Sequence, residues 1–179
     1  EYLALTIFDK MKRIHGMEKR ERLLLQIAVL IHACGKFISV RNSNECAYNI
    51  IMSTEIIGIS HLEREIIANV VRYNIRDFDY NMVRMETELD EVTDSFSGQN
   101  EVMLLIAKLT AMLRLANSMD RGHSAKLADC RMTVKDQNLI ITTDYHGDIT
   151  LESVSFEQKA AFFEEIFGIR PVLRHKKYV

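Results

Sequence analysis

The sequence feature that most constrains the fold is an apolar repeat over residues 99–119. Its apolar positions are Val102, Leu105, Ile106, Leu109, Met112, Leu113 and Ala116. Their spacing of about 3.6 residues is the period of an α-helix with one broad buried face. The chain has 179 residues, of which 47% are hydrophobic and one is proline, so it can build a core around this helix.

Shorter repeats predict further helices before this one. His15-Gly16 and Gly35 are typical ends of the first two, and Ser60-His61-Leu62-Glu63 is a capping box that begins the fourth. The expected helices cover residues 2–14, 18–34, 43 or 44 to about 53, 61–73, and about 82–92. In the second of them, the expected buried face consists of Leu23, Ile27, Leu30, Ile31 and Cys34.

The pattern changes from helical spacing to alternation after Lys126. Residues 130–134 and 139–143 predict two strands of a hairpin, with Gln137-Asn138 at the turn. Ser155 is then expected to cap a helix that Gly168 ends, and residues 169–173 predict a returning strand.

These elements predict a mainly α fold in two parts. A helical domain covers residues 1–126, and a small ββαβ subdomain of α+β type covers residues 127–179. Phe162 on the last helix is expected to face solvent, where it could contact another domain or a second subunit.

Composition excludes several classes of protein. The net charge of −2 argues against polyanion binding through overall charge, although a local basic groove stays possible. Three widely spaced cysteines, Cys34, Cys46 and Cys130, suggest neither a disulfide framework nor a zinc site. The run 23–31 is too short to cross a bilayer, and residues 1–20 lack the order of a signal peptide. We therefore expect a cytoplasmic protein that does not bind membranes.

His32 is the first candidate for chemistry. On a helix it shares a stripe with Leu25, Ala28 and Val29, so its ring would lie along or beside the buried face. We interpret it as a structural, hydrogen-bonded histidine, since polar groups near cores are usually satisfied in this way. The alternative is a metal ligand, although Ala33 beside it offers no second one.

Four runs carry a resemblance to a known family. LLLQIAVLIHACGK, SNECAYNIIM, IIANVVRYN and LRLANSMDRGH look like successive blocks of the helical C-terminal region of the exopolyphosphatase and guanosine pentaphosphate phosphohydrolase family. That region resembles an HD-superfamily domain, so the fold implied for residues 1–126 is an HD-like helical bundle with a truncated first helix. The ββαβ tail also suits this family.

The resemblance implies a dismantled metal site. His32 matches the histidine of the His-Asp pair that active HD domains use, but Ala33 stands where the aspartate should be, and Asn117 takes the place of the late aspartate. A neutral amide is a weaker ligand for a divalent cation. Histidines common in relatives are replaced by Ser43, Glu45 and Asn74. We predict neither a bound metal ion nor a catalytic residue in this chain.

Cationic residues that match family positions remain. Arginines bind phosphate oxygens through bidentate, charge-assisted hydrogen bonds. Alternatively, some of them form structural ion pairs, for example of Asp120 with Arg114 or Arg72. The phosphate-binding candidates are Arg72, Arg114, Arg121, His123, Lys126 and His32, with Lys36 and Arg41 at the rim.

The family resemblance implies an accessory role. In that family, hydrolysis belongs to N-terminal actin-like domains that use magnesium, and this chain resembles the C-terminal part alone. We expect a homodimeric domain that helps an exopolyphosphatase-like hydrolase to bind polyphosphate or guanosine pentaphosphate and is inactive by itself. The alternatives are a metal-dependent HD-type phosphohydrolase, in which His32, Asp120 and His123 would converge on an ion, and a purely structural dimerisation module.

Overall fold

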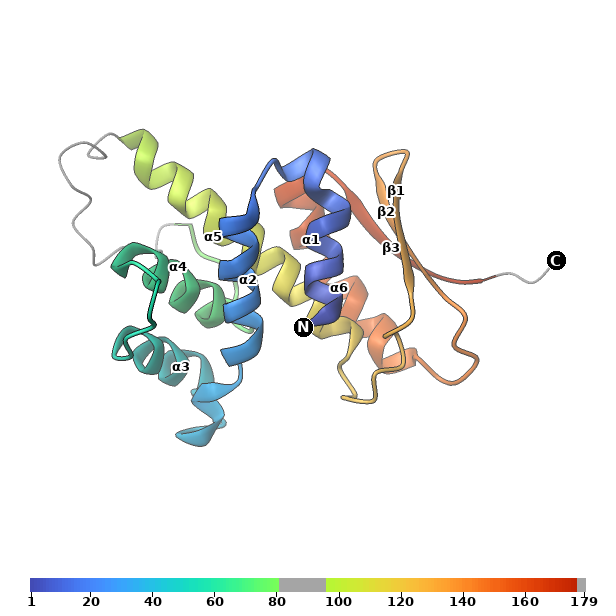
Figure 1. The fold of residues 1–179 in the computed structure, drawn as a ribbon. Coiled ribbons are helices and arrows are strands. Elements are labelled where there is room, and N and C mark those ends of the chain that lie inside the picture. The colour runs from blue at the N-terminus through green and yellow to red at the C-terminus, as the bar shows by residue number, and fades with distance from the viewer. Residues whose placement is uncertain (81–95, 177–179) are drawn as a thin grey trace. The chain divides into compact units, whose positions relative to one another are not determined.

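The computed structural model describes residues 1–80 and 96–176. In these ranges it is mainly helical with one small sheet, which confirms the expected fold class (Figure 1). The helix expected around residues 82–92 lies outside the described residues. The elements are α1 (Tyr2–His15), α2 (Lys19–Ile31), the 3-10 helix η1 (Cys34–Phe37), α3 (Ser43–Met52), α4 (His61–Arg72), α5 (Phe96–Met119), β1 (Arg131–Lys135), β2 (Asn138–Thr143), α6 (Thr150–Phe167) and β3 (Arg170–His175).

The chain divides into two compact units. The first consists of Glu1–Arg22 and Ala111–Val179, and the second of Leu23–Thr110. Helices α2 and α5 each contribute to both units. The change from helices to strands falls between α5 and β1, close to Lys126 as expected, but a domain boundary at that residue stays a prediction.

In the second unit, α2 ends earlier than the sequence suggested. The helix stops at Ile31 instead of Cys34, and η1 follows after a short turn. Gly35 does not have the left-handed conformation of a helix-ending glycine. It is needed for packing instead, because a Cβ there would overlap the carbonyl oxygen of Ser43 and lie 2.6 Å from the Ala47 amide nitrogen. A close approach of η1 to α3 therefore explains this glycine.

The buried face of α2 also differs from the expected one. Leu23 and Leu30 are exposed, whereas the buried positions are Leu24, Leu25, Ala28 and Val29. Leucines cover two adjacent faces of this helix, and spacing alone does not say which face packs inward. Leu25, Ala28 and Val29, the residues expected to share a stripe with His32, thus belong to the face of α2 that packs into the core.

Helices α3 and α4 pack against each other in the second unit. The capping box of α4 is confirmed, since the Ser60 hydroxyl accepts from the Glu63 amide and the Glu63 carboxylate accepts from the Ser60 amide. Helix α3 begins at Ser43 with Asn42 at its N-cap, one residue before the expected cap. The helix expected from residue 99 is confirmed as α5, which begins at Phe96.

Within α5, residues Gly98–Met119 are long and apolar enough to span a membrane by composition, but most of this segment is buried inside the protein. We therefore interpret α5 as a core helix.

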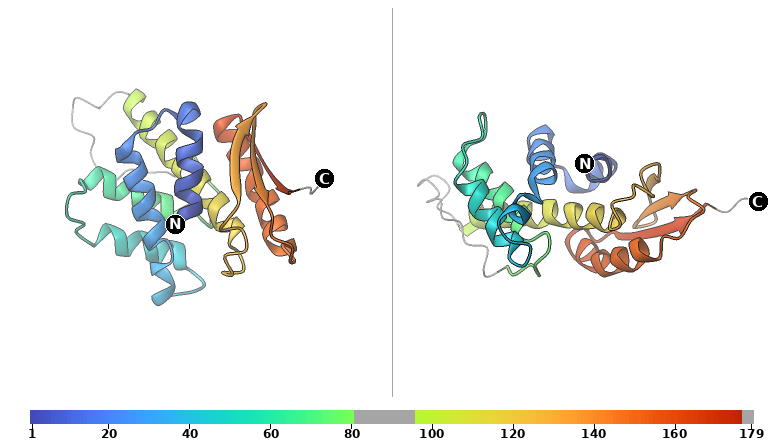
Figure 2. Two further views of the ribbon diagram at one scale, coloured as in Figure 1. Left: turned by 45° about the vertical axis from the view of Figure 1, so that its right-hand side comes forward. Right: turned by 90° about the horizontal axis from the view of Figure 1, so that it is seen from below.

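The first unit contains the ββαβ subdomain. Strand order is β1-β2-β3, with β1 antiparallel and β3 parallel to β2, so α6 makes the crossover between the parallel strands. Helix α6 packs on β3, and α1 lies against β1 (Figure 2). The hairpin turn is Asp136-Gln137, one residue before the expected turn, and both residues have positive φ, at 50° and 58°. The core side chains here include Leu139, Ile141, Phe156 and Phe163.

Helix α6 begins five residues before the expected cap. Ser155 lies inside the helix, which starts at Thr150, and the Thr150 amide donates to the Asp148 carboxylate at 2.8 Å. A carboxylate at a helix N-terminus satisfies a free amide and suits the helix dipole. As predicted, the helix ends at Gly168, in left-handed conformation with φ 64°.

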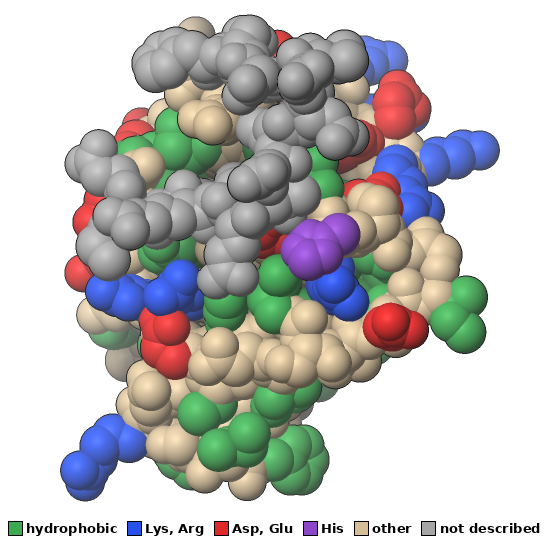
Figure 3. Space-filling model, turned by 90° about the vertical axis from the view of Figure 1, so that its left-hand side faces the viewer, with side chains coloured by type: hydrophobic (Ala, Val, Ile, Leu, Met, Phe, Trp, Pro, Cys, Tyr) green, Lys and Arg blue, Asp and Glu red, His purple; other side chains and the backbone are tan. Residues whose placement is uncertain are grey.

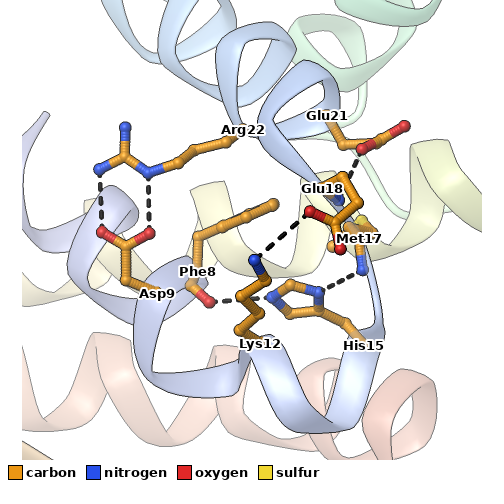
Figure 4. Close-up of polar contacts among 8 residues, drawn as sticks. All are labelled: Phe8, Asp9, Lys12, His15, Met17, Glu18, Glu21 and Arg22. Carbon is orange, nitrogen blue, oxygen red and sulfur yellow. Dashed lines mark hydrogen bonds and ion pairs between the residues drawn. The ribbon is translucent and has the colours of Figure 1, made fainter.

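The corner between α1 and α2 belongs to the first unit and is held by polar contacts (Figure 4). The buried His15 ring donates from Nε2 to the Phe8 carbonyl at 2.9 Å, and its Nδ1 accepts from the Met17 amide at 2.8 Å. The Arg22 guanidinium binds both carboxylate oxygens of Asp9, at 2.8 and 2.9 Å. As predicted, α1 ends at His15-Gly16.

Candidate functional site

His32 lies in the turn that follows α2 and is half-buried. Its Nδ1 donates to the carbonyl oxygen of Val29 at 2.6 Å, one turn back along the chain. That carbonyl is one of the groups left without a partner at a helix C-terminus, so the ring satisfies it. This contact supports the structural interpretation of His32.

The positions that match the metal ligands of active HD domains have other surroundings here. Within residues 1–80 and 96–176, no cluster of three or more His, Cys, Asp or Glu side chains is close enough to hold a metal ion. Ala33 is the N-cap of η1, and Asn74 is buried just after α4. The described residues thus do not form a site for a divalent metal ion. The absence of a metal from the protein stays a prediction.

Arg72 in α4 is held by a carboxylate of α3. Its guanidinium forms a bidentate pair with Glu45, with distances of 2.9 and 2.8 Å, and lies 4.9 Å from the centre of the Tyr48 ring. Burial lowers the pKa of Arg72, but the hydrogen bond and charge of Glu45 outweigh this and raise the pKa overall. Arg76 also contacts Glu45, at 3.2 Å. Arg72 is therefore part of a structural ion pair, with Glu45 and not Asp120 as its partner.

Arg114 in α5 is buried, with 5% of its surface exposed. Its guanidinium lies 4.7 Å from the centre of the Phe162 ring in α6, a cation–π contact. Phe162 is half-buried in this contact and does not project into solvent as expected. Arg114 therefore holds α5 and α6 together and is poorly placed to bind a polymer from solution.

Lys126 is tied to the start of α6. Its ammonium group donates to the Asp148 carbonyl at 2.8 Å and pairs with the Glu152 carboxylate at 3.3 Å. The Glu152 side chain is 1% exposed, so it depends on this lysine for its charge partner. Gly122 lies against the same carboxylate, because a Cβ there would come within 2.9 Å of Glu152 Oε1.

Asp120, the first residue after α5, holds the following loop together through its side chain. Its Oδ1 accepts from the Ala125 amide at 2.9 Å, and in the described part of the chain it forms no ion pair. The ion pair expected with Arg114 or Arg72 is thus replaced by a hydrogen bond within the loop. His123 and Ala125 have positive φ, 49° and 52°, which is uncommon for residues other than glycine and often marks functional segments. We call residues 120–126 the clamped loop.

Two cationic candidates of the clamped loop remain available to a ligand. Arg121 and His123 are exposed, and among the described residues neither side chain has a hydrogen bond or an ion pair. Contacts of Asp120 and Lys126 thus hold the backbone of the loop, and the Arg121 guanidinium and the His123 imidazole face solvent. Such groups bind phosphate oxygens directly.

The six candidates therefore separate into two groups. Arg114, Arg121, His123 and Lys126 belong to the first unit, and His32 and Arg72 to the second. Sequence reasoning missed Glu152 and Asp148, which hold the clamped loop, because it began the last helix at Ser155. The signal that could have found them is Asp148 two residues before Thr150, a common arrangement at helix starts.

Comparison with known proteins identifies the family. The fold is a helical body with a small ββαβ subdomain, and its polar loops lack a complete set of metal ligands among the described residues. The family model described as Ppx/GppA phosphatase, domain III, matches residues 1–160. The chain therefore belongs to the Ppx/GppA phosphatase family, the family of the exopolyphosphatases, in which it corresponds to the C-terminal domain. A search of curated proteins found no match.

Proposed function

We propose that this chain is an accessory domain of a Ppx/GppA phosphatase that binds the phosphate chain of the substrate through Arg121 and His123. Polyphosphate and guanosine pentaphosphate share the linked phosphate groups that these side chains would contact. The observation that carries the proposal is the clamped loop, whose backbone is held by Asp120 and Lys126. Its exposed Arg121 and His123 side chains have no hydrogen-bond or ion-pair partner within the part of the chain that the structure describes.

Hydrolysis would belong to the other domains of such a phosphatase, together with any magnesium ion. This assignment is supported by Ala33 and Asn117, which offer no carboxylate at the two positions where active HD domains have their metal-binding aspartates. Metal analysis of the purified chain tests it. Stoichiometric manganese, iron or nickel that is lost in His32→Ala would favour the metal-dependent alternative instead.

Binding is tested with inorganic polyphosphate and the purified chain at low ionic strength. Arg121→Glu should weaken binding roughly tenfold, because it removes a charge-assisted hydrogen bond and adds repulsion. His123→Gln should weaken it by a smaller factor. Arg13→Glu is the matched control, since Arg13 is an exposed arginine of the same unit and lies on α1.

Comparing these variants shows whether polyphosphate binding depends on the clamped loop or only on the net charge of the chain. Equal losses in Arg121→Glu and Arg13→Glu would show that polyphosphate responds only to net charge, and the clamped loop would not be the site. No binding of the wild-type chain at about 50 mM salt, where polyanion binding is much tighter than at about 200 mM, would refute the proposal outright.

A further inference from the structure

The connection between α2 and α3 exposes three large apolar side chains within four residues. Phe37 is 95% exposed, Ile38 67% and Val40 80%. Lys36 and Arg41 flank them and are exposed as well. We call these five residues the 36–41 patch. At the lower end of the face in Figure 3, apolar side chains gather at the surface beside a projecting basic one.

The backbone under the 36–41 patch is well supported. The Ile38 and Ser39 amides both donate to the Gly35 carbonyl, at 3.1 and 3.0 Å, and the Asn42 amide donates to the Ser39 hydroxyl at 3.1 Å. Gly35 itself packs directly on α3. The apolar side chains are therefore displayed by a fixed turn, and no rearrangement within η1 is needed to present them.

The charges of the 36–41 patch and of the second unit indicate which kind of partner the patch can bind. The side chains of Lys36 and Arg41 have no hydrogen bond or ion pair among the described residues, so the patch is locally basic. The second unit as a whole is acidic, with seven Lys and Arg against twelve Asp and Glu between Leu23 and Thr110. An anionic bilayer would repel such a unit, whereas a protein surface can place an apolar hollow and a few carboxylates opposite the patch.

We propose that the 36–41 patch docks on the other domains of the Ppx/GppA protein, at an apolar surface rimmed by aspartate or glutamate. A chain that corresponds to one domain of a multidomain family is expected to have such an interface. Large exposed apolar side chains on a fixed turn are its usual mark. The inference rests on family membership and is independent of phosphate binding by the clamped loop.

Hydrogen exchange compares this chain alone with the whole Ppx/GppA protein that contains it. The amides of residues 36–41 should exchange at least tenfold more slowly in the whole protein. Phe37→Asp combined with Val40→Asp should abolish that extra protection without changing the melting temperature of the chain alone. Val154→Asp is the control, because Val154 is also an exposed apolar residue but lies in the first unit. Equal exchange in both proteins would overturn the proposal.

A fluorescent reporter tests whether the 36–41 patch binds a membrane or a second copy of the chain instead. The chain contains no tryptophan, so Phe37→Trp reports on this patch alone. Its emission in the isolated chain should be that of an exposed indole at all protein concentrations and with phosphatidylcholine/phosphatidylglycerol vesicles. A blue shift with vesicles would assign the patch to a membrane, and one that grows with protein concentration would assign it to a second copy. Arg121→Glu should change none of these readings, so the two proposals fail separately.

Discussion

Replacing Lys126 by methionine should destabilise the chain strongly, although the substitution keeps most of the side-chain volume. The ammonium group lies 3.3 Å from the Glu152 carboxylate, whose side chain is 1% exposed. At an effective dielectric constant of about 20, unit charges at that distance attract by about 5 kcal/mol. Desolvation offsets part of this attraction, and Lys126 is itself 22% exposed, so we expect a net loss of about 2–4 kcal/mol.

Urea denaturation measures this loss as a change in the free energy of unfolding, and the melting temperature should fall by roughly 4–16 °C. Lys135→Met is the matched control, because Lys135 is an exposed lysine on β1. Adding Glu152→Gln to Lys126→Met should recover part of the stability, since no buried charge is then left alone. A loss below about 0.5 kcal/mol in Lys126→Met would refute the claim that this pair holds the clamped loop.

Three further predictions concern other parts of the chain. Gly35→Ala should cost at least about 2 kcal/mol in urea denaturation, because the new Cβ would force η1 away from Ser43 and Ala47. The hydrogen bond and charge of Arg22 hold the pKa of Asp9 below its ordinary 3.8 despite some burial, so this stabilisation is complete above about pH 5 and is lost as pH falls through the lower folded pKa. Asp9→Asn should thus lose at most about 1 kcal/mol at pH 7, as the carboxylate is 53% exposed, and should approach wild-type stability in acid. Burial raises the pKa of Cys130 to about 11, so at pH 8 only about a thousandth of this thiol is ionised, and it should react with Ellman's reagent only after unfolding.

Local chemistry made much of the fold predictable from sequence. The capping box at Ser60 and the left-handed glycines Gly16 and Gly168 act within a few residues of the helix ends that they set. The apolar repeat of α5 is long enough to be unambiguous. The alternation of apolar and polar residues after Lys126 is also a local pattern, and it correctly indicated the strands of the ββαβ subdomain.

Features set by distant contacts were predicted less well. Gly35 was interpreted as a helix end, but its role comes from packing on α3. Whether a candidate side chain forms an ion pair likewise depends on a partner far along the chain. Glu45 is 27 residues from Arg72, and Glu152 is 26 residues from Lys126. The family resemblance pointed to these residues but could not separate the structural ones from Arg121 and His123, which are exposed.

The salt dependence of polyphosphate binding tests the central claim most directly. Each cation that contacts a phosphate releases counterions, so the affinity of the wild-type chain should fall steeply on a plot of log affinity against log salt. Arg121→Ala should reduce that slope by about one, and Arg13→Ala should leave it unchanged. A wild-type slope near zero, or the same slope in wild type and Arg121→Ala, would contradict phosphate binding by the clamped loop.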